Sequence, residues 1–409
     1  MSGPSVASSM LPAVERRLKY AGPALFSYGF RPFFFGGAVW SAACIILWIP
    51  QFMGELSLRT AYTPLDWHIH EMLYGYVAAV AAGFLLTAIP NWTGRLPICG
   101  GPLATLAALW LSGRLVMLLS VQTGIALAAL IDVAFLTTLA AVAAREIVAG
   151  RNWRNLRVLA VLGLLIAGNI VFHAEVCAYG KAEYGIRIGI GAVILLISVV
   201  GGRVVPSFTR NWLARQEKGR LPAPFSRFDV VTITVSAASL AMWVGLPDNV
   251  ITGSFLILAA AMQCVRLARW AGDRTASDRL VLILHVGYAF VPIGFALLGT
   301  SIVYPSFVPV SAGIHAWTAG AFGMMTLAVM TRASLGHTGQ PLAAGPGTQA
   351  IYLFAFCAAM LRIVAAFNGS IVMIELASMA WVAAFGGFAL LYGPKLATRP
   401  PAWAGRADP

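Results

Sequence analysis

The chain has 409 residues, of which 59% are hydrophobic and only 11% are charged. An average soluble domain is about 25% charged, and a soluble globule of this composition would have too little polar surface to cover itself. These values exclude a water-soluble protein and indicate that the lipid bilayer is the solvent.

Twelve apolar runs are each long enough for a helix that crosses about 30 Å of hydrocarbon, which takes about 20 residues. They lie near 32–53, 68–90, 101–120, 124–146, 155–178, 184–206, 228–246, 249–270, 278–302, 308–332, 348–368 and 370–393. We therefore predict an all-α, polytopic integral membrane protein with a twelve-helix domain over 32–393. Turns are expected at five places, and 207–227 is the only polar linker of any length. The turns are expected at Pro50, Pro90–Asn91, Pro206, Pro247–Asp248 and Asn368–Gly369.

The formal net charge of +13 comes from 28 Lys and Arg residues against 15 Asp and Glu residues. On a membrane chain this excess is typical of cytoplasmic loops, so we expect no nucleic-acid partner. With a cytoplasmic N-terminus, only Arg59, Lys181 and Arg187 among the cationic loop residues fall on the outer side. This asymmetry predicts two cytoplasmic termini, with a segment 1–31 before the membrane domain and a tail 394–409 after it.

The sequence contains one internal similarity. A shift of 245 residues places His70 on His315 and Gly75 on Gly320, and Arg114 matches Arg362 within one extra helical turn. The offset suggests pseudo-symmetric four-helix units.

Four of the six histidines are predicted to lie in one layer near the extracytoplasmic face: His68, His70, His173 and His315. Ionisable side chains in hydrocarbon cost about 2.5–3.5 kcal/mol each on insertion scales, so each needs a partner or a function. Neutral imidazole is a common ligand of copper, zinc and haem iron. We therefore expect these four residues to be metal-binding.

The repeat-related positions of His70 and His315 suggest that they hold haem iron from opposite faces. At a similar depth, Arg114 and Arg362 would bind the haem propionates, because guanidinium binds carboxylate with two parallel hydrogen bonds.

His68 and His70 are two residues apart, so on a helix their side chains point about 200° apart. The two histidines are therefore expected to serve different centres, with His68 and His173 on a second metal.

Structural interpretations of the same residues stay open. Any of the histidines could simply hydrogen-bond between helices. The two arginines, Arg114 and Arg362, could pair as structural ion pairs with nearby acids, namely Glu71, Glu175, Glu375 or Asp132.

Several longer strings resemble the NnrS family. They are Gly29–Phe34, His68–Met72, Gly83–Ala88, Asn91–Gly94, Gly201–Arg203, His315–Gly320 and Met330–Gly339. The resemblance implies a bacterial inner-membrane protein of twelve helices that contains haem b and copper and acts in the nitric oxide response of denitrifying or nitrosatively stressed bacteria.

The fold is also similar to the catalytic subunit of haem-copper oxidases, which has haem-binding histidines on helices 2 and 10. That subunit also has a copper-binding histidine on helix 6 and several histidines on helix 10. This chain departs from that pattern, because its sixth predicted helix, 184–206, has no histidine and its tenth, 308–332, has a single one, His315. A binuclear centre of the oxidase kind is therefore not expected.

Three functions follow as expectations. The first is a haem and copper protein that binds nitric oxide and reduces it to nitrous oxide with electrons from a quinol or a periplasmic donor, with Glu71 and Glu175 as catalytic proton donors. The second is a non-catalytic haem protein that binds nitric oxide or passes on its signal. The third is a transporter of a metal or small solute, in which the histidine layer is the binding site. Whether the protein is an enzyme stays open.

Overall fold

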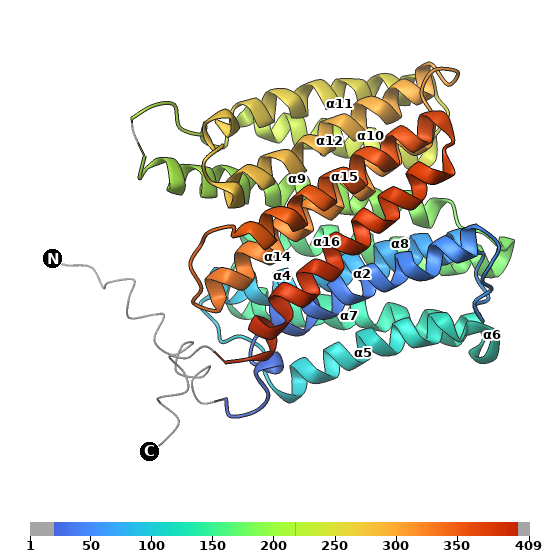
Figure 1. The fold of residues 1–409 in the computed structure, drawn as a ribbon, viewed down its shortest axis with the longest axis horizontal. Coiled ribbons are helices and arrows are strands. Elements are labelled where there is room, and N and C mark those ends of the chain that lie inside the picture. Colours follow the sequence, from blue (N-terminus) through green and yellow to red (C-terminus); the bar gives the residue numbers. More distant parts are fainter. Residues whose placement is uncertain (1–19, 217, 400–409) are drawn as a thin grey trace.

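The computed structural model describes residues 20–216 and 218–399, and every regular element in these ranges is a helix (Figure 1). The long helices are α2 (Phe30–Phe52), α4 (Ala78–Thr93), α5 (Gly101–Leu118), α7 (Ile125–Ala149), α8 (Leu156–Tyr179), α9 (Tyr184–Leu213), α10 (Arg227–Gly245), α11 (Val250–Ala268), α12 (Arg279–Val303), α14 (Gly323–His337), α15 (Pro346–Asn368) and α16 (Ile371–Ala397). The short ones are η2 (Ala24–Phe26), α3 (Pro64–His70), η3 (Glu71–Val77), α6 (Ser120–Thr123), η4 (Trp153–Asn155), η5 (Gly272–Arg274), α13 (Val310–His315) and η6 (Ala316–Phe322). Helices suit hydrocarbon because each satisfies its backbone hydrogen bonds within one segment.

Within the described ranges, 11 helices are long and apolar enough to cross a membrane. They correspond to all of the predicted runs except 308–332. That run is helical as α13, η6 and α14, but it is not among the 11. The all-α membrane architecture is therefore confirmed, whereas a twelfth crossing stays a prediction.

The distribution of side chains is that of a protein surrounded by lipid. Large apolar residues face outward, among them Leu130 at 68% exposure and Leu390 at 82%. Charged side chains lie inside, with Glu71 at 0% and Arg114 at 1% exposure. Burying charge while exposing leucine is unfavourable in water, so this pattern supports a bilayer around the bundle.

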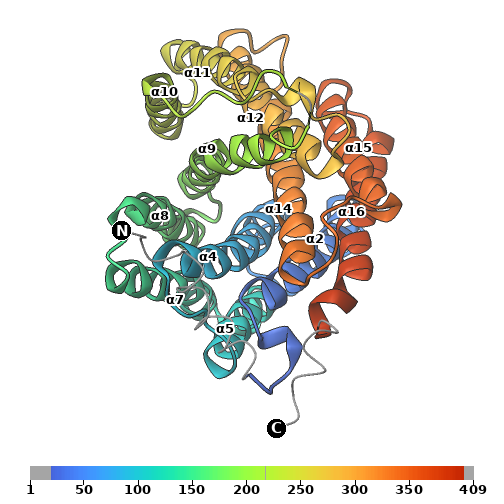
Figure 2. The ribbon, with the colours of Figure 1, turned by 90° about the vertical axis from the view of Figure 1, so that its left-hand side faces the viewer.

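Seen along the helices, the chain runs around the bundle in sequence order (Figure 2). The inner helices are α4, α9, α12 and α14, and α5, α7, α8, α10, α11, α15 and α16 lie toward the outside. The turns η3 and η6 both contact α9. The inner helices therefore place residues from distant parts of the sequence side by side.

The two ends of the described chain meet at one end of the bundle (Figure 1). Arg399 donates hydrogen bonds to the backbone carbonyl oxygens of Tyr20, at 3.1 Å, and Gly22, at 2.7 Å. In the membrane domain, Trp381 on α16 donates to the hydroxyl of Ser41 on α2 at 2.9 Å. These contacts join the first long helix to the last.

The predicted turns at Pro247–Asp248 and Asn368–Gly369 are confirmed, whereas the other three are wrong. Pro50, Pro90 and Pro206 lie inside α2, α4 and α9 and do not begin turns. As a result α9 continues to Leu213, so the linker predicted at 207–227 is helical over its first third. Prolines are tolerated within membrane helices because neighbouring groups compensate for the lost backbone bond.

Two π-helical turns, which the sequence did not predict, interrupt the inner helices. The first, η3, follows His70 directly, and the second, η6, follows His315 directly. Their first residues, Glu71 and Ala316, are separated by the same offset of 245 residues as the similarity in the sequence. Single π-helical turns are frequent at functional sites.

Candidate metal centre

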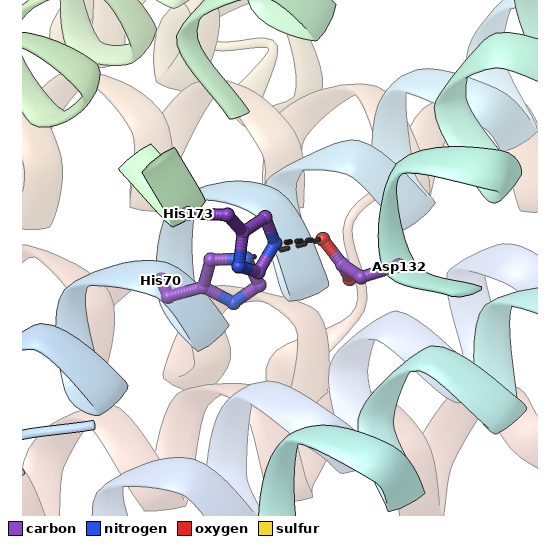
Figure 3. Close-up of side chains that lie close together, drawn as sticks. All are labelled: His70, Asp132 and His173. Carbon is purple, nitrogen blue, oxygen red and sulfur yellow. Dashed lines mark hydrogen bonds and ion pairs between the residues drawn. The ribbon is translucent and has the colours of Figure 1, made fainter. Parts of the chain in front are cut away.

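The candidate centre is formed by three side chains from three helices. His70 ends α3, Asp132 lies on α7 and His173 lies on α8. All three are buried, and they can each offer one ligand atom such that all three atoms lie within 4.8 Å of one another. In Figure 3 the two rings and the carboxylate point toward a common point.

The two imidazoles meet at the same carboxylate oxygen. Nε2 of His70 lies 3.1 Å from Oδ2 of Asp132, and Nε2 of His173 lies 3.2 Å from that oxygen. The ring centroids are 4.9 Å apart. Two imidazole nitrogens and one carboxylate form a donor set that suits iron, copper or zinc.

A buried arginine joins this group to a second carboxylate. Arg114 donates from Nη1 to Oε2 of Glu71 at 2.8 Å and from Nη2 to Oδ1 of Asp132. Glu71 also accepts from the indole of Trp40 at 2.7 Å, and its Oε1 lies 3.1 Å from Nδ1 of His70.

The carboxylates of this cluster outnumber its guanidinium groups. The carboxylates of Glu71 and Asp132 face a single guanidinium, that of Arg114. Uncompensated charge in a buried site is strongly unfavourable. The excess negative charge is therefore balanced by a protonated imidazole, a protonated carboxyl group or a bound cation.

The π-helical turn makes room for the arginine. A Cβ on Gly75 would lie 2.3 Å from Nη1 of Arg114 and 3.0 Å from Oε2 of Glu71, so any larger residue would displace the ion pair. The carbonyl of Gly75 accepts a hydrogen bond from Trp110 at 3.0 Å, which fixes the turn against α5.

Two further residues orient the ligands, and the sequence did not reveal either. Asn169 donates to Oδ2 of Asp132 at 2.7 Å, and its own Oδ1 lies 3.1 Å from Nε2 of His70. The hydroxyl of Tyr62 lies 2.8 Å from Nδ1 of His173. Asn169 and His173 are four residues apart on α8, a spacing that places them on one helical face and could have suggested Asn169.

The structure groups the predicted residues differently from the sequence-based assignment. His68 and His70 do face different surroundings, as expected from their spacing on α3. However, His70 lies with His173, whereas His68 stacks on Trp48, with ring centroids 4.4 Å apart. His68 is close enough to His315 to interact with it electrostatically.

The two predicted proton donors occupy different environments. Glu71 is fully buried in the cluster around Arg114. Glu175 accepts hydrogen bonds from the backbone N–H groups of Glu183, Tyr184 and Gly185 at 3.1, 2.9 and 2.8 Å. Its carboxylate therefore caps the first turn of α9, where the positive end of the helix dipole stabilises an anion.

The sequence model of the NnrS protein matches residues 24–399. The chain belongs to the NnrS family. No curated protein sequence matches the chain. The match to the family includes every long helix of the bundle and all three residues of the candidate centre. The family string His68–Met72 supplies the last residues of α3 and the first of η3, and it contains one residue of the centre, His70.

Proposed function

We propose that this NnrS-family membrane protein binds nitric oxide at a buried metal centre formed by His70, Asp132 and His173, as part of a bacterial response to nitric oxide. Two observations support the proposal. The family model covers nearly the whole chain, and two imidazoles and a carboxylate converge in a buried cluster with an excess of negative charge. The convergence of these three side chains is the observation on which the proposal mainly depends.

The residues fit a metal ion by the chemistry of their donor atoms. Nε2 of His70, Nε2 of His173 and Oδ2 of Asp132 all face the same point. A divalent cation there would compensate the carboxylate charge that Arg114 leaves over. We propose copper or iron as the ion, with haem b as a further cofactor. A bound redox metal would supply an open position for nitric oxide and exchange electrons with it.

The protein side chains prepare this site. The hydroxyl of Tyr62 and the carboxylate of Glu71 lie beside the Nδ1 atoms of His173 and His70 and fix the orientation of the two rings, as partners of metal-ligating histidines commonly do. Arg114 holds both carboxylates in place. Phe172 packs against His70, with ring centroids 5.0 Å apart, and keeps water from that face.

Reduction is the reaction that we propose for the bound nitric oxide. Two molecules of nitric oxide, two electrons and two protons yield one nitrous oxide and one water. A membrane quinol or a periplasmic donor supplies the electrons. Glu71, which lies beside Nδ1 of His70, is placed to hold and transfer a proton.

The membrane arrangement that we propose has twelve crossings, with both termini in the cytoplasm of a bacterial inner membrane. The two described ends meet at one end of the bundle, as an even number of crossings requires. The segment 310–337 supplies the twelfth crossing. The shared offset of η3 and η6 supports related four-helix units, similar to those of haem-copper oxidase subunits.

The test uses the full-length protein purified from bacterial membranes, with metal analysis and anaerobic turnover of nitric oxide. We expect His173→Ala and Asp132→Asn each to lower bound copper or non-haem iron by at least about tenfold, as loss of a ligand predicts. His285→Ala is the matched control, because His285 is also buried but contacts Thr209 in a different part of the bundle.

The outcomes separate the candidate functions. Continuous release of nitrous oxide supports a reductase, whereas saturation at one nitric oxide per metal supports a protein that only binds. Metal content that is the same in all variants and wild type contradicts the proposed centre.

A further inference from the structure

A second group of ionisable side chains lies outside the candidate centre. It comprises His68 at the end of α3, His315 at the end of α13 and Arg362 on α15. Each of the three is close enough to the other two to interact electrostatically. No residue of the group is a ligand of the His70 centre.

His68 has an unused ring nitrogen. Its Nδ1 is buried and has no hydrogen-bond partner among the described residues. The ring itself is held by stacking on Trp48, with an interplanar angle of 14°. Because an unsatisfied buried polar atom costs about 1–3 kcal/mol, this ring requires an explanation that protein contacts do not supply.

His315 has the orientation of a ligating histidine. Its Nδ1 lies 2.7 Å from the backbone carbonyl oxygen of Ser311, to which it donates. This bond places the proton on Nδ1 and leaves the lone pair on Nε2. A backbone carbonyl commonly fixes the tautomer of metal-bound histidines in this way.

Arg362 is a cation without a counter-ion. It is half-buried in a membrane helix and makes no ion pair with any residue of the described ranges. At the offset of 245 residues Glu71 corresponds to Ala316 and Asp132 to Ala377, and at the 248 residues that separate Arg114 from Arg362, Asp132 corresponds to Ala380. The two carboxylates that neutralise Arg114 are thus both replaced by alanine, and Arg362 is left for an external anion.

We propose that His68 and His315 ligate a metal carried by an anionic chelate, and that Arg362 binds a carboxylate of that chelate. A haem has both chemical features, a metal with two axial positions and two propionates. This inference rests on the proposed function, which includes haem b, and it assigns the haem to a site separate from the His70 centre.

The experiment measures haem in full-length protein purified in detergent, by the pyridine haemochrome method and by the optical and paramagnetic resonance spectra of the oxidised form. We expect wild type to have low-spin iron with two histidine ligands. His68→Ala and His315→Ala are expected to lose haem or to convert the iron to high spin. Arg362→Gln should weaken haem retention by about tenfold, and Arg362→Lys should weaken it less.

Two control variants make the result specific. Asp132→Asn alters the His70 centre and is expected to keep the haem spectrum. His285→Ala removes a buried histidine elsewhere and is also expected to keep it.

Each contrary outcome has a distinct meaning. Full low-spin haem in both His68→Ala and His315→Ala overturns the inference and leaves the proposed function intact, as does loss of haem in Asp132→Asn alone. Wild type with copper or iron at the His70 centre, no haem and no spectral change with added hemin also overturns only the inference. Wild type with neither metal nor haem overturns both.

Discussion

The region around His70 and Arg114 and the region around His315 and Arg362 are built alike but neutralise their charges differently. In each, a histidine directly precedes a π-helical turn, and an arginine lies on a neighbouring helix. Glu71 and Asp132 neutralise the first arginine, whereas alanine occupies both corresponding positions in the second region. The comparison shows that one framework can hold its arginine with or without acids at these positions, and this difference is the reason for proposing a cation at the first site and an anionic ligand at the second.

The largest effect is expected from removing each arginine in turn. Arg114→Met leaves two buried carboxylates without their cation and should lower the free energy of unfolding by about 3–5 kcal/mol. Arg362→Met removes a cation that has no carboxylate partner in the described ranges, so the change in haem-free protein should be within about 1 kcal/mol. Chemical denaturation in detergent measures both, and equal losses would contradict the comparison.

The glycines of the two π-helical turns allow a second comparison. A Cβ at Gly75 would meet Arg114 at 2.3 Å, whereas a Cβ at Gly320 would meet the ring of Phe290 at 2.3 Å. Each Gly→Ala change should destabilise the protein by about 1–3 kcal/mol through overpacking. Only Gly75→Ala should also reduce the bound copper or iron, which metal analysis of both variants would reveal. A loss of this metal in Gly320→Ala would count against separate centres.

An acid can be introduced where the second region lacks one. Ala377→Asp places a carboxylate seven residues after the α15–α16 turn, and Arg362 lies about as far before it. An internal partner for Arg362 should compete with the propionate and weaken haem retention by about tenfold. Ala377→Asn has nearly the same size without the charge and is the control. If both variants retain haem equally, charge at Arg362 is not what binds the ligand.

The smallest effect is expected from the outer partner of His173. Tyr62→Phe removes one hydrogen bond and should lower the free energy of unfolding by about 0.5–1.5 kcal/mol. Because the tautomer of His173 is then less firmly fixed, metal affinity at the first centre should fall by about tenfold while the haem spectrum is unchanged. Equilibrium dialysis against copper measures the affinity, and an unaltered value would exclude an orienting role for Tyr62.

The sequence identified many residues of the candidate site but not which of them lie together. Histidines with spacing and depth suited to a metal could be identified, and the divergence of His68 from His70 follows from helical geometry. The sequence could not predict whether His68 or His70 lies beside His173, because this depends on the rotation of α3 about its axis. Asn169 and Tyr62 were missed because neither residue type indicates a metal site without a histidine already placed beside it.

Two expectations from local sequence patterns concern residues whose surroundings depend on neighbouring helices. Pro206 predicted a turn, but α9 passes through it to Leu213. Glu175 stays a predicted proton donor, and the structure places its carboxylate on the first backbone N–H groups of α9. Both outcomes depend on where the neighbouring helix lies, which no local pattern encodes.

The sequence by itself determined the solvent of this protein, its helical class, the positions of most of its spans and its family, because apolar run length and long family strings are local properties. Only the tertiary structure decided which charges neutralise one another, since Glu71, Arg114 and Asp132 meet through the packing of three separate parts of the chain. Likewise, the two π-helical turns and the distinct surroundings of His70 and His315 depend on inter-helix contacts. Electrostatic and ligand interactions depend on distances in space, and these are set only when the helices pack.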